Sequence, residues 1–162
     1  MQGEAQAARG AAAELIGGAE DELVFTRGAT EAINLVAARF TNGSRKRVLL
    51  SALEHHSNIV PWQLAGYAID VVPLTHDGQI DLDAAERMAN ESHAVVAFAH
   101  VSNVLGSILD ARRAATIAHK VGAKLLLDGC QAGPRMPVDV TDLGCDVYAF
   151  PGHKLYGPPG RG

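Results

Sequence analysis

Short, continuous apolar runs separated by helical patterns are the feature that most constrains the fold of this chain. The clearest runs occupy residues 48–50, 94–99 and 125–127, and weaker ones occupy 71–74 and 145–150. Strands of this kind are buried on both faces, as in a parallel sheet covered by helices. The sequence therefore predicts an α/β fold with a mainly parallel, doubly wound sheet and right-handed crossovers.

The segments between these runs have helical patterns with recognisable ends. We expect helices at residues 4–17, 59–67, 81–88 and 110–120, and another after the glycine turn at 27–31. Gly122 follows the helix at 110–120 at a normal C-cap position. A further strand is expected at 23–26, just before the glycine turn. We divide the chain into an N-terminal helical segment, residues 1–19, and an α/β domain, residues 20–162.

Lys154 follows the last predicted strand, inside a segment rich in turn-forming residues. Gly152 precedes it, and the sequence Gly-Pro-Pro-Gly follows at 157–160. A lysine that is flanked by apolar residues and held on a turn loses its proton more easily than a solvated one, and a neutral amine can condense with a carbonyl group. An isolated lysine in such a loop is usually an ordinary surface residue, so its assignment depends on residues elsewhere in the chain.

Asp128 stands at the C-terminal end of the apolar run at 125–127. Ligands in open α/β sheets bind beyond the carboxyl ends of the strands. A carboxylate there can accept a hydrogen bond from a ring nitrogen, and Gln131 can reach a neighbouring polar atom. A helix N-cap is the alternative role for this aspartate. Together with the amine of Lys154, the carboxylate describes a site for pyridoxal 5′-phosphate (PLP).

Five sequence blocks, in order, carry a resemblance to a known family. They read RGATEAINLVA, LEHHSNIVPWQ, HVSNVLGSILD, LLLDGCQA and FPGHKLYGPPG, and the match extends from about residue 20 to residue 162. The chain resembles the class V aminotransferase superfamily of PLP fold type I, and most closely its group II, SufS-like cysteine desulfurases and selenocysteine lyases. The resemblance implies the large domain of that fold, with helices on both faces of the sheet, and PLP as the cofactor.

The resemblance also implies which residues bind the cofactor. The phosphate would lie against Ala29 and Thr30, at a helix N-terminus whose free amides and dipole favour an anion. The imidazole of His55 would stack on the pyridine ring and take part in proton transfer. Asn103 would bond the phenolic oxygen of the cofactor or the carboxylate of the substrate. His153 would contact the phosphate.

Lys154 and His55 are the predicted catalytic residues, and Asp128 and Gln131 complete the predicted cofactor site. By resemblance, Lys154 would hold PLP covalently and act as acid and base at the substrate's α carbon, while Asp128 would keep the ring nitrogen protonated. Pro151 is a departure, because the family usually has a serine there whose hydroxyl binds the phosphate. Proline has neither this hydroxyl nor a backbone N–H, so we expect weaker cofactor retention.

The activity implied by the resemblance is removal of sulfur from L-cysteine, with L-alanine and an enzyme persulfide as products, for sulfur transfer or iron–sulfur cluster assembly. L-Selenocysteine is the related substrate, and the family implies a homodimer and a sulfur-acceptor protein. Because the family places its persulfide cysteine well downstream of Lys154, we expect a partial large domain with impaired turnover. Another class V enzyme (aminotransferase, epimerase or kynureninase-like hydrolase) and a non-catalytic PLP-domain remnant are the alternatives.

Composition argues against several other classes of protein. The formal net charge is −4, and the only basic run is the short one at 45–47, so nucleic acid is not an expected partner. The apolar stretches are far shorter than the roughly 18 residues of a membrane helix. The N-terminus lacks the basic and apolar regions of a signal peptide and contains acidic residues, so we expect a cytoplasmic location.

The cysteines and histidines do not predict a metal site. Cys130 and Cys145 are not spaced as a CxxC pair and lie beside or within apolar segments, so we interpret them as buried structural thiols. His55 and His56 are adjacent, but zinc usually needs three or four protein ligands, and no partner for the pair is apparent in the sequence. No metal is therefore predicted.

Overall fold

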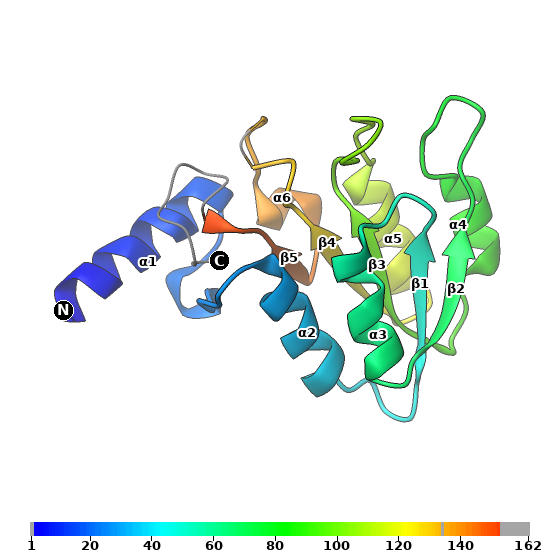
Figure 1. The fold of residues 1–162 in the computed structure, drawn as a ribbon, viewed down its shortest axis with the longest axis horizontal. Helices are drawn as coiled ribbons and strands as arrows, with labels where there is room; N and C mark the ends of the chain where they lie inside the picture. Colours follow the sequence, from blue (N-terminus) through cyan, green and yellow to red (C-terminus); the bar gives the residue numbers. More distant parts are fainter. Residues whose placement is uncertain (1, 134, 153–162) are drawn as a thin grey trace.

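A parallel β-sheet forms the centre of the molecule (Figure 1). The computed structural model describes residues 2–133 and 135–152. In this part of the chain the sheet order is β2-β1-β3-β4-β5, and all neighbouring strands are parallel. The strands are β1 (Arg47–Ser51), β2 (Ala68–Val72), β3 (His93–Ala99), β4 (Lys124–Asp128) and β5 (Val147–Ala149). The predicted α/β fold with a parallel sheet is confirmed.

The central strand β3 is the most deeply buried part of the sheet. All of its residues are buried except Ala99, which is partly exposed at its carboxyl end. Val96 lies opposite Leu49 of β1 on one side and Leu125 of β4 on the other. The uninterrupted apolar run at 94–99 therefore reflects burial on both faces, as the pattern predicted.

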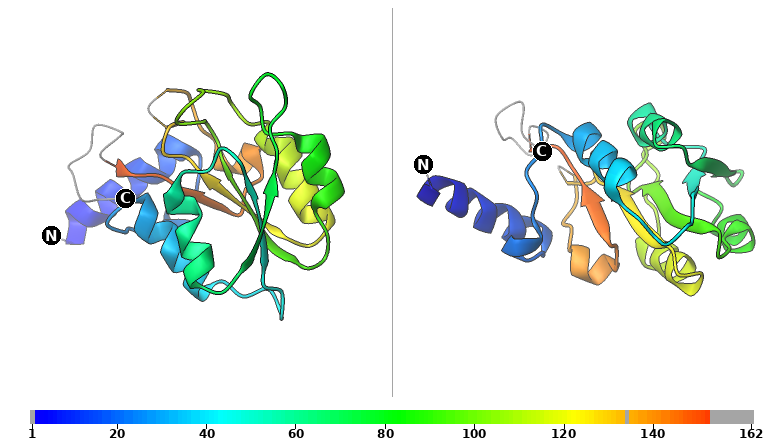
Figure 2. Two further views of the ribbon diagram at one scale, coloured as in Figure 1. Left: turned by 45° about the vertical axis from the view of Figure 1, so that its right-hand side comes forward. Right: turned by 90° about the horizontal axis from the view of Figure 1, so that it is seen from below.

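Helices cover both faces of the sheet, and two views show the layers (Figures 1 and 2). Ile33 and Trp62 of the helices on one face pack with Leu50, whereas Ile117 of the other layer packs with Phe98. The first face is covered by α2 (Ala29–Arg39) and α3 (Val60–Leu64), and the second by α4 (Leu82–Met88) and α5 (Ala111–Lys120). The remaining helical segments are α1 (Gln2–Ile16), η1 (Glu20–Glu22), η2 (His56–Asn58) and α6 (Val140–Leu143).

Aspartates fix the starts of three helices on the second face and beside β5. Asp81 accepts the Ala84 N–H at 2.8 Å before α4, and Asp110 accepts the Arg113 N–H at 3.0 Å before α5. Asp139 caps α6 in the same way. Because a side-chain cap satisfies one of the otherwise unpaired amides of a helix, the sequence determines where these helices begin.

The strand predicted at 23–26 does not form. Val24 is 67% exposed and Phe25 is 44% exposed, and no strand of the described chain lies beside them to complete a ladder. Instead, the guanidinium of Arg9 donates to the Leu23 carbonyl and lies 5.1 Å from the centre of the Phe25 ring. A short apolar run forms a strand only where a neighbouring strand is available to pair with it. Here Leu23 and Phe25 contact Arg9 of α1 instead.

Two other predicted elements form at shifted positions. The strand expected at 71–74 is β2, which begins at Ala68 opposite Arg47 and ends before Pro73. Proline cannot donate a ladder hydrogen bond, so the end of the strand at this residue is understandable. The helix expected at 59–67 is the shorter α3, which ends before Gly66, a residue with φ of 78°.

The strand order places a change of direction between β1 and β3. The chain leaves β1 toward β2 on one side and later returns to place β3 on the other side. In doubly wound sheets, the loops after such strands diverge and leave a crevice at the carboxyl edge. The segments 52–59 and 100–109, which follow β1 and β3, lie at this edge (Figure 1).

Gly129 provides a test of how β4 and β5 are joined. Its N–H donates to the Ala149 carbonyl at 2.8 Å, and an added Cβ would overlap the ring of Tyr148. The hydroxyl group of Tyr148 bonds to His100 Nδ1 at 3.0 Å, so the ring cannot move away without losing this hydrogen bond. Gly129→Ala should lower the free energy of unfolding by about 1–3 kcal/mol in urea denaturation.

Gly18→Ala is the matched control for this prediction. A Cβ at Gly18 would meet its nearest neighbour, Val140, at 3.4 Å, which is ordinary contact distance. This variant should be close to wild type in stability. Equal stability of the Gly129→Ala variant and the wild type would show that Tyr148 does not constrain this turn.

Candidate active site

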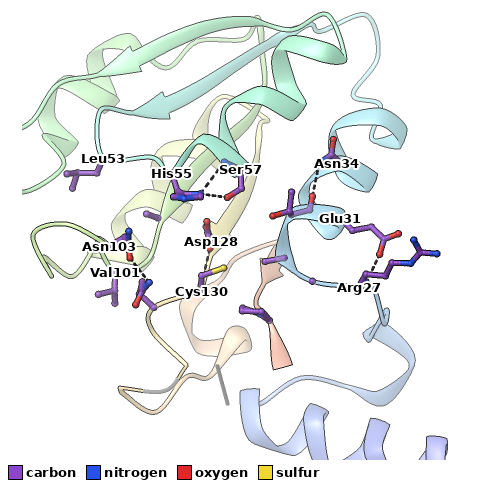
Figure 3. A pocket seen from close by; sticks show the side chains of 16 residues that line it. Arg27, Glu31, Asn34, Leu53, His55, Ser57, Val101, Asn103, Asp128 and Cys130 are labelled. Atoms are coloured by element: carbon purple, nitrogen blue, oxygen red, sulfur yellow. Dashed lines mark hydrogen bonds between the residues drawn. The ribbon is translucent and has the colours of Figure 1, made fainter. Parts of the chain in front are cut away.

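A cleft of about 770 Å³ lies at the carboxyl edge of the sheet. Figure 3 shows that its lining comes from several separate segments: the start of α2, the loop after β1, and the loops after β3 and β4. Its residues are Arg27, Gly28, Ala29, Thr30, Glu31, Asn34, Leu53, His55, Ser57, Ala99, Val101, Asn103, Asp128, Cys130, Gln131 and Pro151. The predicted site residues that fall in the described chain are all among them.

The N-terminus of α2 forms one wall of the cleft. Gly28 is the N-cap, with φ of 153°, and it provides no side-chain cap. Ala29 is buried and Thr30 is exposed, and both line the cleft. The Glu31 carboxylate folds back to accept the Arg27 N–H. A helix start without a side-chain cap, open to a cleft, is suited to bind an anion.

His55 lies in the loop after β1, and its exposed ring lines the cleft (Figure 3). Its Nδ1 lies 2.8 Å from Ser57 Oγ and accepts the Ser57 N–H at 3.3 Å. Because Nδ1 is an acceptor, a neutral ring carries its proton on Nε2. His56 is also exposed, and its ring centre is 3.9 Å from that of His55.

Asp128 is the buried carboxylate of the cleft. It ends β4, its residue is 6% exposed, and its Oδ1 accepts the Cys130 N–H at 3.0 Å. Residues 130–133 form turns, so Asp128 does not cap a helix and the N-cap alternative is wrong. A negatively charged group at the end of a central strand would favour a cationic part of a ligand.

Asn103 and Gln131 meet across the cleft from the loops after β3 and β4. The Gln131 amide donates to Asn103 Oδ1 at 2.6 Å. Both residues line the cleft, and the contact joins residues 28 positions apart in the sequence. The structure therefore brings together two residues that sequence reasoning had assigned separately to one ligand.

The last predicted residues lie at or beyond the end of the described chain. Pro151 is buried and lines the cleft, so the segment after β5 approaches the same place. His153 and Lys154 lie outside the described residues. Their assignment remains a prediction, which the position of Pro151 makes testable.

Glu54 is a polar residue of this region that the sequence analysis missed. One carboxylate oxygen accepts the Ser51 hydroxyl at 2.5 Å and the Ala99 N–H at 2.9 Å, and the other accepts the Asn58 amide at 2.7 Å. Burial raises the pKa of Glu54 to about 7, although these hydrogen bonds oppose the rise. The only signal in the sequence was a glutamate three residues after a buried strand.

The two cysteines have different surroundings. Cys145 is partly buried rather than fully buried as predicted, and this burial raises its pKa to about 11, which agrees with an unreactive structural thiol. Cys130 packs against the core beside α2 and α3 but also lines the cleft, so its interpretation as a purely structural thiol is incomplete. The sequence did not reveal this because the turn after Asp128 decides which side the thiol faces.

The described chain offers neither a metal site nor a membrane-spanning helix. Residues 2–133 and 135–152 contain no group of three or more His, Cys, Asp and Glu side chains that could hold a metal ion. In the same residues no helix has both the length and the apolar composition needed to cross a bilayer.

Comparisons with known proteins agree with this architecture. The class-V aminotransferase family model matches residues 2–162. A probable cysteine desulfurase of Halalkalibacterium halodurans and a cysteine desulfurase of Escherichia coli are each 46% identical over 149 residues, which make up 88% of this chain and 37% of those proteins. The chain thus spans about a third of the length of these relatives.

Solved structures give the same result. A crystal structure of a cysteine desulfurase from Escherichia coli matches with a TM-score of 0.89 and 37% identity, over 96% of this chain and 41% of that one. The apo structure of a cysteine desulfurase from Thermococcus onnurineus matches with a TM-score of 0.86 and 33% identity, over 96% and 40% of the two chains. The fold, the cleft and these matches together show that the chain belongs to the class-V aminotransferase family.

Proposed function

We propose that this chain forms the PLP-binding part of a cysteine desulfurase. One observation carries the proposal: the residues assigned to the cofactor from separate sequence blocks line a single cleft. These residues are Ala29, Thr30, His55, Asn103, Asp128 and Gln131. Membership of the class-V aminotransferase family supports the same conclusion.

The cleft fits this cofactor in size and in chemistry. Its volume of about 770 Å³ lies within the range of small-molecule sites. The start of α2, which has no side-chain cap, suits a phosphate, and the Asp128 carboxylate suits a protonated ring nitrogen. These two groups are presented by different elements of one cleft, as a ligand with an anionic and a cationic end requires.

Each residue has a separate task in the proposed reaction. When bound, PLP supplies an electron sink for the charge that develops at the α carbon of an amino acid. Asp128 would stabilise the positive ring nitrogen, and the flat ring of His55 would cover the cofactor and move a proton. Lys154 would hold the cofactor and transfer a proton at the α carbon.

The finer parts of the proposal rest on the resemblance of the sequence blocks to group II enzymes. L-Cysteine would be converted to L-alanine with transfer of its sulfur to a cysteine of the enzyme, and L-selenocysteine is the related substrate. A homodimer, a sulfur-acceptor protein and a cytoplasmic location belong to the same proposal. So does the division into a helical segment, residues 1–19, and a PLP-binding domain, residues 20–162.

The first test concerns the attachment of the cofactor. After incubation with PLP and reduction with borohydride, the modified peptide should contain Lys154, and Lys154→Ala should abolish the labelling. The reason is that Lys154 follows Pro151, which lines the cleft, by three positions. Peptide mass spectrometry measures both results.

Lys124→Ala is the control for this test. Lys124 begins β4, at the opposite end of that strand from Asp128, and pairs with Asp146 at 2.7 Å. Its replacement should leave the labelling unchanged. Labelling that persists without Lys154 would contradict the assignment of the PLP-binding lysine.

A second test concerns Pro151, which replaces the usual serine. Pro151→Ser should tighten PLP binding, because it adds a hydroxyl that can bond the phosphate; a hydrogen bond to a charged group contributes roughly 1.5 to 3 kcal/mol. Equilibrium titration of PLP measures the change. Pro73→Ser, at an exposed position after β2, should have no effect. An unchanged or weaker affinity of Pro151→Ser would show that position 151 does not contact the phosphate.

A further inference from the structure

The carboxylate of Glu54 joins three segments at the carboxyl edge of the sheet. Its partners are Ser51 at the end of β1, Ala99 at the end of β3, and Asn58 in η2. All three partners are donors. Four lone-pair sites of an ionised carboxylate can accept them together, and this arrangement uses the group only as an acceptor. These hydrogen bonds favour the ionised form, but burial opposes it more strongly and raises the pKa of Glu54 to about 7.

The network continues from Glu54 to the only tryptophan of the sequence. Asn58 is fully buried, donates its amide N–H to Glu54, and accepts the indole N–H of Trp62 at 3.1 Å. Trp62 is also fully buried. The orientation of the Asn58 amide therefore links the protonation state of Glu54 to the surroundings of Trp62.

The same network holds the loop that carries His55. Glu54 directly precedes His55, and the Asn58 N–H donates to the His55 carbonyl at 2.8 Å. The Ser57 N–H donates to the His55 ring. Asn58, whose side chain bonds to Glu54, therefore also fixes the backbone of His55. Its neighbour Ser57 fixes the ring of His55.

We propose that Glu54 is a positioning residue, whose carboxyl group ties the loop after β1 to the end of β3 and so keeps His55 at the cleft. The consequence for catalysis rests on the proposed function. The consequence for the loop rests only on the contacts of this chain.

The charged and titratable groups around Glu54 come from several elements. Asp128 of β4 is the charged group that acts on it, and its negative charge raises the pKa of Glu54 further. His100, which follows Ala99 after β3, bonds to Tyr148, and burial lowers the pKa of this histidine, which favours its neutral form. His55 and His56 directly follow Glu54 on its own loop. The other members of the network, Asn58 of η2 and Trp62 of α3, carry no charge.

The sign of the pH effect follows from the raised pKa. Because burial raises the pKa of Glu54 from its ordinary 4.5 to about 7, the closed loop favours the protonated carboxyl group, which can donate to the hydroxyl oxygen of Ser51. As the pH rises through 7, an ionised carboxylate stays buried beside Asp128, and this contribution to the stability of the closed loop is lost. We therefore expect the loop to be held tightly below pH 7 and to loosen as the pH rises through this value.

Fluorescence of Trp62 in the full chain tests the proposal directly. The emission should change with a midpoint near pH 7, and this change should be absent in Glu54→Gln. Glu91→Gln, which alters an exposed glutamate outside the network, should keep it. A wild-type emission that does not vary between pH 5 and 9, or a midpoint near 7 that persists in Glu54→Gln, would overturn the proposal.

Two further variants keep the test decisive should Glu54→Gln fold poorly. Ser51→Ala removes a donor that lowers the pKa of Glu54, so the midpoint should move to higher pH. Asp128→Asn removes a negative charge that raises it, so the midpoint should move to lower pH. Midpoints that do not move in these opposite directions would contradict the assignment of the transition to Glu54.

Amide hydrogen exchange shows whether the loop itself responds. At pH 8, the Ser57 and Asn58 amides should exchange about tenfold or more faster in wild type than in Glu54→Gln, because only the wild type then has an ionised carboxylate buried beside the loop. At pH 5.5 the two proteins should differ little. Equal rates at pH 8 would refute the coupling of Glu54 to the loop. Both readouts use the chain without cofactor, so they decide this proposal independently of the PLP-labelling test.

Discussion

Burial of β3 on both faces is the constraint on which the rest of the structure depends. Its neighbours must be strands, because its backbone groups have no access to water, and helices must cover both faces. Parallel neighbours then bring the carboxyl ends of β1, β3 and β4 to one edge. The polar residues that follow these strands meet there, although up to about 80 positions separate them in the sequence.

A carboxylate forms hydrogen bonds with neighbouring strands at each end of the sheet, but the pKa of the two acids shifts in opposite directions. At the amino end, Asp70 bonds the guanidinium of Arg47 and the buried ring of His93, so its carboxylate is matched by a cation. At the carboxyl end, Glu54 has neutral donors and a second carboxylate, Asp128, nearby. The hydrogen bond from Arg47 lowers the pKa of Asp70, whereas burial raises the pKa of Glu54 although its neutral donors oppose the rise. Of the two acids, only Glu54 therefore changes its charge near neutral pH, and it lies beside the cleft.

The sequence was sufficient for the features that local pattern determines. The strand at 47–51 and the helix starts at Asp81 and Asp110 follow from apolar runs and caps, and the cleft residues follow from ordered motifs. Patterns failed where a non-local contact decides. Residues 23–26 have the composition of a strand but no partner strand, and Glu54 resembles a surface glutamate until β3 is placed beside it.

The position of PLP in a crystal of the cofactor-loaded chain is the most direct test of the whole account. We predict the phosphate at the amides of Ala29 and Thr30, the ring nitrogen beside Asp128, and a covalent link to Lys154. His55 should lie over the ring. Cofactor bound at another lysine, with the cleft between α2 and Asp128 empty, would contradict the account.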